Sequence, residues 1–179
     1  MGFFSRRSKE ERAGADDAPR RAGTEDESAT GGVAAGPGPT VELVDGRPVS
    51  SPLTSAERTR IAHGLEVLRG QGIEIDDLAA LDEAYDRAFS AYRSGVGQDP
   101  ADVVETFGIA IGEYLARHSH RDWAVVTDVF GTDLGLVDAR ADTVIVPHNI
   151  VSARWMRGET RWIPGVVEHL VSLRPRPLA

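Results

Sequence analysis

Two aspartates and one histidine in the second half of the chain have the types and spacing that suit acid–base chemistry. Asp128 and Asp133 flank a turn signal at Gly131, and His148 follows a short valine-rich run. Paired carboxylates beside an imidazole can transfer protons or hold a divalent cation. Aspartates are also common in turns, because they accept hydrogen bonds from nearby backbone amides. Two interpretations stay open: a small hydrolase or ligand-binding enzyme that uses His148 with Asp128 or Asp133, and aspartates that only stabilise the turn.

Asn149 and Arg154 extend this candidate binding site into the helix expected to follow. Asn149 comes directly after His148, where a strand passes into a helix, and its side chain can cap that helix. Polar groups at such a junction meet the helix N-terminus, a common place for binding. Arg154 is expected about one turn further along, directed over the same end of the sheet or paired with an aspartate. These residues form the predicted binding site; none is assigned a catalytic role.

Arg154, Arg157 and Arg161 form a basic stripe interleaved with Trp155 and Trp162. Arginine beside aromatic residues suits nucleic acid or another anion. The alternative is a solvated helix face on which the arginine stems cover the tryptophans. The net charge of −8 disfavours nucleic acid, since proteins that bind phosphate backbones usually carry a basic excess.

Neither a cofactor nor a metal ion is expected. The chain has no cysteine, and the glycine-rich phosphate loops, the serine nucleophile elbow and the zinc-binding helix motif are absent. The five histidines are scattered over predicted helices and one junction: His63, His118, His120, His148 and His169.

Three helices are predicted to precede the candidate site. The first begins at Thr54, which forms a capping box with Glu57, and the second runs from about Asp77 to Arg93. The third begins at the N-cap Asp99, followed by Pro100. Gly108 and Gly112 lie four residues apart on it and predict the close approach of another backbone.

Three valine-rich runs then predict an antiparallel meander: 123–127, 133–137 and 143–146. The first and third strands of a meander run parallel, so the first turn and the exit of the third strand lie at the same end of the sheet. This topology brings Asp128, Asp133 and His148 near one another. A final helix through Trp155, kinked or restarted at Pro164, completes an α+β fold with helices on one face of the sheet.

The composition predicts one domain behind an N-terminal tail. Residues 1–52 form a disordered tail and linker with a possible short strand or hairpin at 41–49, and 53–179 form a single domain. No apolar run approaches the length of a membrane span, although Phe3 and Phe4 beside basic residues allow weak contact with an anionic membrane. The expected location is the cytoplasm.

Four ordered blocks of the sequence resemble a bacterial family, the domain of unknown function 3806. They are 123–128, 131–134, 147–151 and 154–155, and the helix around Gly108 and Gly112 fits the element before them. The resemblance covers roughly residues 85–173. It implies a compact α+β domain without an assigned activity and supplies no catalytic residue.

These observations favour a non-catalytic protein-interaction module, of adaptor or inhibitor type, whose partner is another protein. The enzyme that uses His148, and anion or nucleic-acid binding through Arg154, Arg157 and Arg161, remain the alternatives.

Overall fold

The computed structural model describes residues 48–138 and 143–174. All of them belong to one compact unit, Thr40–Ala179, whereas Met1–Pro39 lies outside the described residues. The predicted tail at 1–52 and the predicted strand or hairpin at 41–49 therefore lie outside them too, except for their last few positions.

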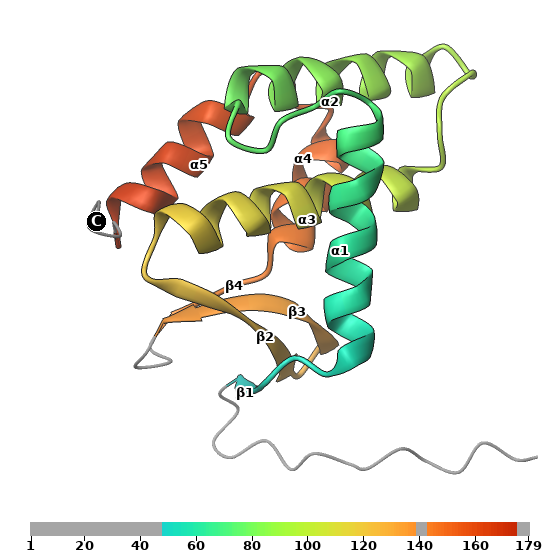
Figure 1. Ribbon diagram of the computed structural model, residues 1–179. Helices are drawn as coiled ribbons and strands as arrows, with labels where there is room; N and C mark the ends of the chain where they lie inside the picture. The colour runs from blue at the N-terminus through green and yellow to red at the C-terminus, as the bar shows by residue number, and fades with distance from the viewer. Residues whose placement is uncertain (1–47, 139–142, 175–179) are drawn as a thin grey trace, which may run out of the picture. The chain divides into compact units, whose positions relative to one another are not determined.

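Five helices and four strands make up the described part of the chain (Figure 1). In chain order they are β1 (Val49–Ser51), α1 (Ser55–Gly70), α2 (Leu78–Arg93), α3 (Pro100–His118), β2 (Arg121–Asp128), β3 (Gly131–Asp138), β4 (Val144–Ile145), α4 (Pro147–Arg157) and α5 (Ile163–Ser172). The α+β class is confirmed. Among the described residues, no helix is both long and apolar enough to cross a membrane.

The sheet has four strands rather than the three of the predicted meander. Its order is β1-β2-β3-β4, with every neighbouring pair antiparallel. The additional strand, β1, pairs Val49 with Thr127 and Ser51 with Val125. Pro48 and Pro52 flank it, which weakens the sequence signal, but prolines are tolerated beside an edge strand because its outer N–H groups need no partner.

The predicted starts of the first three helices are confirmed. Thr54 and Glu57 form the capping box of α1. Asp77 caps α2 by accepting from the Ala80 amide at 2.9 Å, and Asp99 caps α3 by accepting from the Ala101 amide at 2.8 Å. Each cap satisfies an amide that the first helical turn leaves without a partner.

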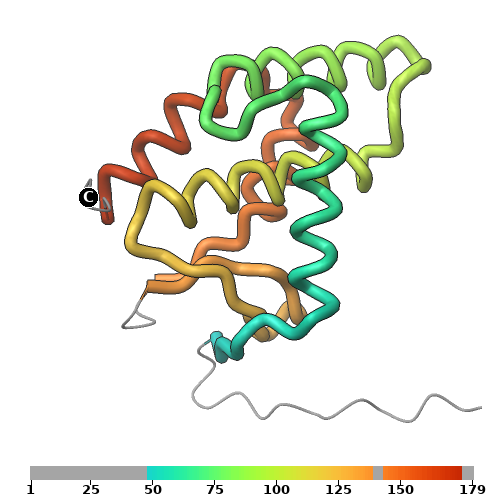
Figure 2. Tube along the Cα trace, in the orientation of Figure 1, coloured from blue at the N-terminus to red at the C-terminus, as the bar shows by residue number. Residues whose placement is uncertain are grey.

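Helix α3 is the centre of the fold and lies between the sheet and α2 (Figures 1 and 2). Its apolar residues join two clusters of buried side chains. The larger cluster reaches the sheet at Leu136, and the smaller one joins Ile61 of α1, Ile109 of α3 and Leu134 of β3. Because α3 contacts every other helix as well as β2 and β3, it fixes the position of the sheet relative to α4.

Gly108 and Gly112 admit aromatic side chains to α3, not the second backbone that the sequence predicts. A β-carbon at position 108 would come within 2.5 Å of the His148 ring, and one at 112 would collide with the indole of Trp123. The spacing of small residues indicates where a helix surface is hollow, but it does not specify what fills the hollow.

The predicted final helix is two helices, α4 and α5. Gly158 ends α4 in the left-handed conformation, with φ 68°, and Pro164 lies in the first turn of α5. The turn between them is held by α2: Asp86 accepts from the Arg161 amide at 3.2 Å and Asp82 from the Ile163 amide at 2.9 Å. Arg161 has φ 55°, a conformation that non-glycine residues rarely adopt.

Candidate functional site

A two-residue turn, Val129-Phe130, joins β2 to β3, and we call it the hairpin tip. Asp128 stabilises it by accepting from the Phe130 amide at 2.7 Å, and Gly131 has the predicted positive φ, at 135°. Val129 is 66% exposed and Phe130 is 95% exposed. The tip is thus a stabilised turn that presents two apolar side chains to solvent.

His148, the second residue of α4, is directed into the protein. The residue is only 6% exposed, and its ring lies against Gly108 of α3. Pro147 begins α4, with its fixed φ suited to the first helical position. Consequently Asn149 is inside the first turn and is not the cap: the N-cap is Val146, which makes no side-chain capping hydrogen bond.

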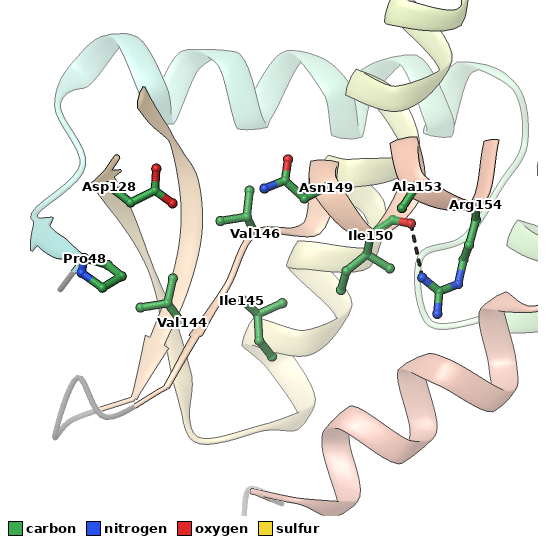
Figure 3. Close-up of a pocket in the computed structure, with 9 residues that line it drawn as sticks. All are labelled: Pro48, Asp128, Val144, Ile145, Val146, Asn149, Ile150, Ala153 and Arg154. Atoms are coloured by element: carbon green, nitrogen blue, oxygen red, sulfur yellow. Dashed lines mark hydrogen bonds between the residues drawn. The ribbon is translucent and has the colours of Figure 1, made fainter. Parts of the chain in front are cut away.

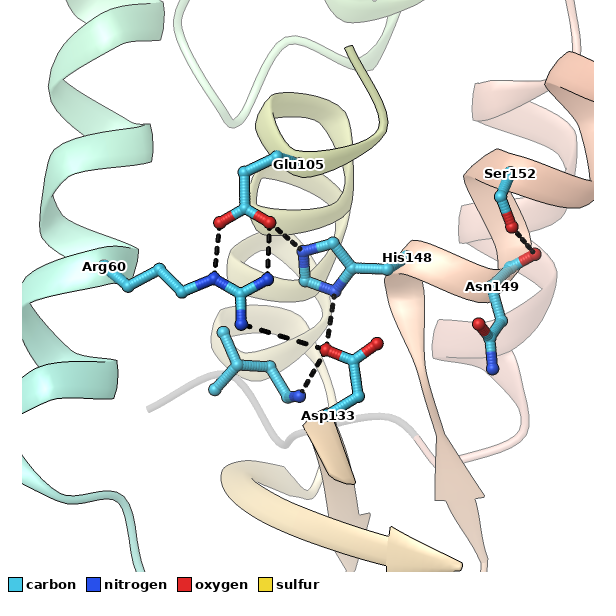
Figure 4. A network of polar contacts seen from close by, with 7 residues as sticks. Arg60, Glu105, Asp133, His148, Asn149 and Ser152 are labelled. Carbon is cyan, nitrogen blue, oxygen red and sulfur yellow. Dashed lines mark hydrogen bonds and ion pairs between the residues drawn. The ribbon is translucent and has the colours of Figure 1, made fainter. Parts of the chain in front are cut away.

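The His148 ring lies between two carboxylates (Figure 4). Its Nε2 is 3.2 Å from Oε2 of Glu105, and its Nδ1 is 3.7 Å from Oδ1 of Asp133. Neither ring nitrogen has hydrogen-bond geometry to a partner in the described residues. Arg60 of α1 donates two hydrogen bonds to Glu105, and its NH1 lies 3.9 Å from Oδ1 of Asp133. We call these four residues the histidine network.

Burial lowers the pKa of His148, although Asp133 and Glu105 act in the opposite direction. Hydrogen bonding from Arg60 is the main reason that the pKa of Glu105 is lowered. The imidazole is therefore neutral at pH 7, while Arg60 shares its single positive charge between two carboxylates. Because both ring nitrogens face acidic side chains in a buried position, the histidine is poorly placed to reach a substrate.

Sequence reasoning missed Arg60 and Glu105. They lie on different helices, 45 residues apart, and no local spacing connects them. The only available signal was that α1 and α3 each carry a charged residue near their apolar faces, which is too common to select a pair. Asp133 is in the network, whereas Asp128 is at the hairpin turn.

Two surface cavities that share lining residues contain the other residues of the predicted site. The smaller, about 130 Å³, is the tip cavity; it is lined by Asp128, Phe130, Asp133 and Asn149, together with Val126, Gly131, Thr132 and Val146. The larger, about 490 Å³, is the groove, which runs along β4 and along α4 as far as Arg154 (Figure 3). Asp128, Val146 and Asn149 line both.

Arg154 lines the far end of the groove and has partners within its own helix and the following turn. Its NH1 donates to the Ile150 carbonyl at 3.3 Å, and its guanidinium carbon lies 4.7 Å from the centre of the Trp162 ring. Glu159 is 3.8 Å from Nε of Arg154 and 3.6 Å from NH1 of Arg157. Arg154 pairs with neither Asp128 nor Asp133 within the described residues.

The described residues contain no group of three or more histidine, cysteine, aspartate or glutamate side chains that could hold a metal ion. Glu105 and Asp133 reach His148 from opposite sides of its ring, so the three do not converge on one point (Figure 4). The described residues around the two cavities therefore present apolar and acidic side chains to solvent.

Residues 77–165 match the family model described as Domain of unknown function (DUF3806). The chain matches no curated protein and no solved structure. The resemblance seen in the sequence is thereby confirmed, over a segment that begins and ends about eight residues earlier than expected.

Proposed function

The chain belongs to this family, and we propose that its domain is a non-catalytic protein-interaction module that binds a partner through the hairpin tip. The exposure of Phe130 carries the proposal. Phe130 is 95% exposed on a turn that Asp128 stabilises, and it lines the tip cavity.

Burying the tip against a partner supplies binding energy. Covering a phenylalanine or valine side chain is worth about 1.5–3 kcal/mol each. Aromatic side chains on preformed surfaces are frequent anchors of protein interfaces, because they bury much area and lose little conformational entropy. A fixed turn keeps that entropy cost low.

The surroundings of His148 argue against the enzyme alternative. Its side chain is 7% exposed, and its two nitrogens face Glu105 and Asp133. A general base must reach the proton that it removes. A buried ring between two carboxylates instead serves to connect α3, α4 and β3.

The arginine alternative has weaker support than the tip. Arg154 stacks on Trp162 and lies near Glu159, and Arg157 lies near the same glutamate. An anion would have to compete with that carboxylate for both guanidinium groups.

Site-specific photo-crosslinking in the host cell tests the proposal. A photoreactive phenylalanine analogue is placed at Phe130 in the full chain, with a control at Val96, which is 81% exposed in the α2–α3 loop. We expect a discrete adduct from position 130, absent at 96, whose yield falls in a Val129→Ser background. Equal labelling at both positions, or an adduct insensitive to Val129→Ser, would contradict the proposal.

The variant His148→Gln distinguishes the proposed interaction module from the enzyme alternative. His148→Gln is examined for folding by circular dichroism and for the adduct from position 130. If the protein stays folded, the adduct should persist, because the ring does not line the tip cavity or the groove. Loss of the adduct from a folded His148→Gln chain would favour a site centred on the histidine.

A further inference from the structure

We infer that the partner presents an extended segment in which a lysine or arginine side chain enters the tip cavity and neighbouring apolar side chains lie along the groove. This rests on the proposed function and specifies the chemistry of the partner.

The tip cavity has the size and lining for a cationic head group. At roughly 30 Å³ per water molecule, its volume of about 130 Å³ holds about four waters, comparable to the four heavy atoms of a guanidinium. Asp128 and Asp133 line it, and its lining residues include no lysine, arginine or histidine. A cation that enters it meets two carboxylates and no lining positive charge.

Asp128 and Asp133 each have one carboxylate oxygen that can accept hydrogen bonds from a ligand. Oδ1 of Asp128 accepts from the Phe130 amide, and Oδ1 of Asp133 accepts from the Leu134 amide at 2.7 Å. These bonds fix both side chains. Within the described residues, no hydrogen bond or ion pair involves Oδ2 of either aspartate. Two oriented carboxylates with unused oxygens suit the multiple donors of a guanidinium or an ammonium.

The network behind Asp133 leaves this end of the surface negative. His148 is neutral and directs Nδ1, without a hydrogen bond, at Oδ1 of Asp133. Arg60 gives its hydrogen bonds to Glu105 and only approaches Asp133, at 3.9 Å. The positive charge of Arg60 thus faces the two carboxylates of Glu105 and Asp133, and Asp128 adds a further negative charge. The resulting excess of negative charge complements a basic side chain of the partner.

Phe130 also lines this cavity and adds an aromatic side chain to it. A cation within about 6 Å of an aromatic ring centre is attracted by the ring quadrupole. An exposed ring beside two carboxylates therefore combines cation–π and charge-assisted contacts in one place. Phe130 would therefore make two kinds of contact with the partner: apolar contact at the hairpin tip and a cation–π contact in the tip cavity.

The lining of the groove favours an extended segment. β4 is an edge strand of the described sheet, and Val144, Ile145 and Val146 line the groove together with Ile150 and Ala153 of α4 (Figure 3). An extended chain beside an edge strand can pair with its backbone while alternate side chains enter pockets. Since Asp128 and Asn149 line both cavities, the basic residue lies at one end of the segment and the apolar residues follow.

A phage-displayed library of random peptides tests the inference with the full chain as bait. We expect selected peptides to carry lysine or arginine next to apolar residues. A fluorescently labelled peptide from the selection should bind about tenfold more weakly to Asp128→Asn and to Asp133→Asn. Each substitution keeps an oxygen for the backbone amide and removes the charge. Glu168→Gln, an exposed charge change on α5, is the control and should leave binding unchanged.

The outcomes separate the inference from the proposed function. Selected peptides that lose binding to Phe130→Ser depend on the hairpin tip. If these peptides carry no basic residue, or bind Asp128→Asn and Asp133→Asn as tightly as the original chain, the inference alone is overturned. No enrichment over a Phe130→Ser bait would overturn both. Replacing the basic residue of the labelled peptide by norleucine should reproduce the loss seen with the aspartate variants, and unchanged affinity would overturn the inference.

Discussion

The imidazole of His148 lies directly against the α-carbon of Gly108, so that Cδ2 of the ring would be 2.5 Å from a β-carbon at that position. This contact joins the start of α4 to the middle of α3. It also holds the ring between Glu105 and Asp133. The histidine network therefore depends on having glycine, which has no side chain, at position 108.

Gly108→Ala should therefore destabilise the domain, even though alanine is the better helix former. Overpacking costs typically about 1–3 kcal/mol, against up to about 1 kcal/mol gained in helix propensity. The free energy of unfolding in urea measures the difference. Gly165→Ala is the matched control, because a β-carbon at this helical glycine meets nothing within 4 Å, and it should be neutral or stabilising. Equal effects of the two substitutions would contradict the role of the contact.

The stability of the domain should fall between pH 7 and pH 5 because of His148. Its pKa is lowered by burial, so the unfolded chain binds the proton more readily than the folded one. The stabilisation is present above the unfolded-state pKa of about 6.5 and is lost as the pH falls through the folded-state pKa. When the free energy of unfolding in urea is plotted against pH, the slope should be smaller for His148→Gln than for the original chain. The exposed, non-titrating substitution Met156→Ala should leave the slope unchanged. An unchanged slope in His148→Gln would refute this assignment.

Trp155→Ala should cost about 3–5 kcal/mol, as large-to-small core substitutions do. The indole is 7% exposed and packs edge-on to Tyr85 and Phe89, with ring centres 5.8 and 5.0 Å away. Met156→Ala is a control at the neighbouring position, where the side chain is 79% exposed, and should change stability by less than about 0.5 kcal/mol. A loss below about 1 kcal/mol for Trp155→Ala would show that the tryptophan is not an anchor of the core.

A chain that begins at Thr54 should be less stable than one that begins at Thr40. The shorter chain lacks β1, and β2 then loses its partner on that side. With backbone hydrogen bonds worth roughly 0.5–1.5 kcal/mol each, the expected loss is about 1–2 kcal/mol. Differential scanning calorimetry should show the lower melting temperature. Identical melting temperatures would mean that β1 adds nothing to the stability of the sheet.

Helix starts and the hairpin turn could be predicted wherever a few neighbouring residues identify them. Thr54 and Asp99 are caps that a few neighbouring residues identify, and Gly131 marks the turn of the hairpin. The start of α4 was placed too late, because an asparagine two residues after a proline resembles a cap, while the helix already begins at Pro147.

For the site, the sequence predicted only those neighbours that the order of the strands brings together. A meander returns its third strand to the end of the first turn, and there Asp133 lies 3.7 Å from His148. Arg60 and Glu105 come from α1 and α3, and their pairing depends on how two helices pack. That information is not present in any short stretch of sequence.

The packing of α4 on α3 has a consequence for the order of folding. The two helices flank β2, β3 and β4 in the chain, so the contact of His148 with Gly108 closes a loop that contains most of the sheet. Loop closure costs about 0.6 kcal/mol more for each doubling of the flexible length. The short turn between β2 and β3 shortens that length before α4 docks, so early pairing of this hairpin accelerates the docking. Substitutions in the β2–β3 turn should slow folding, whereas those at the α3–α4 contact should mainly accelerate unfolding.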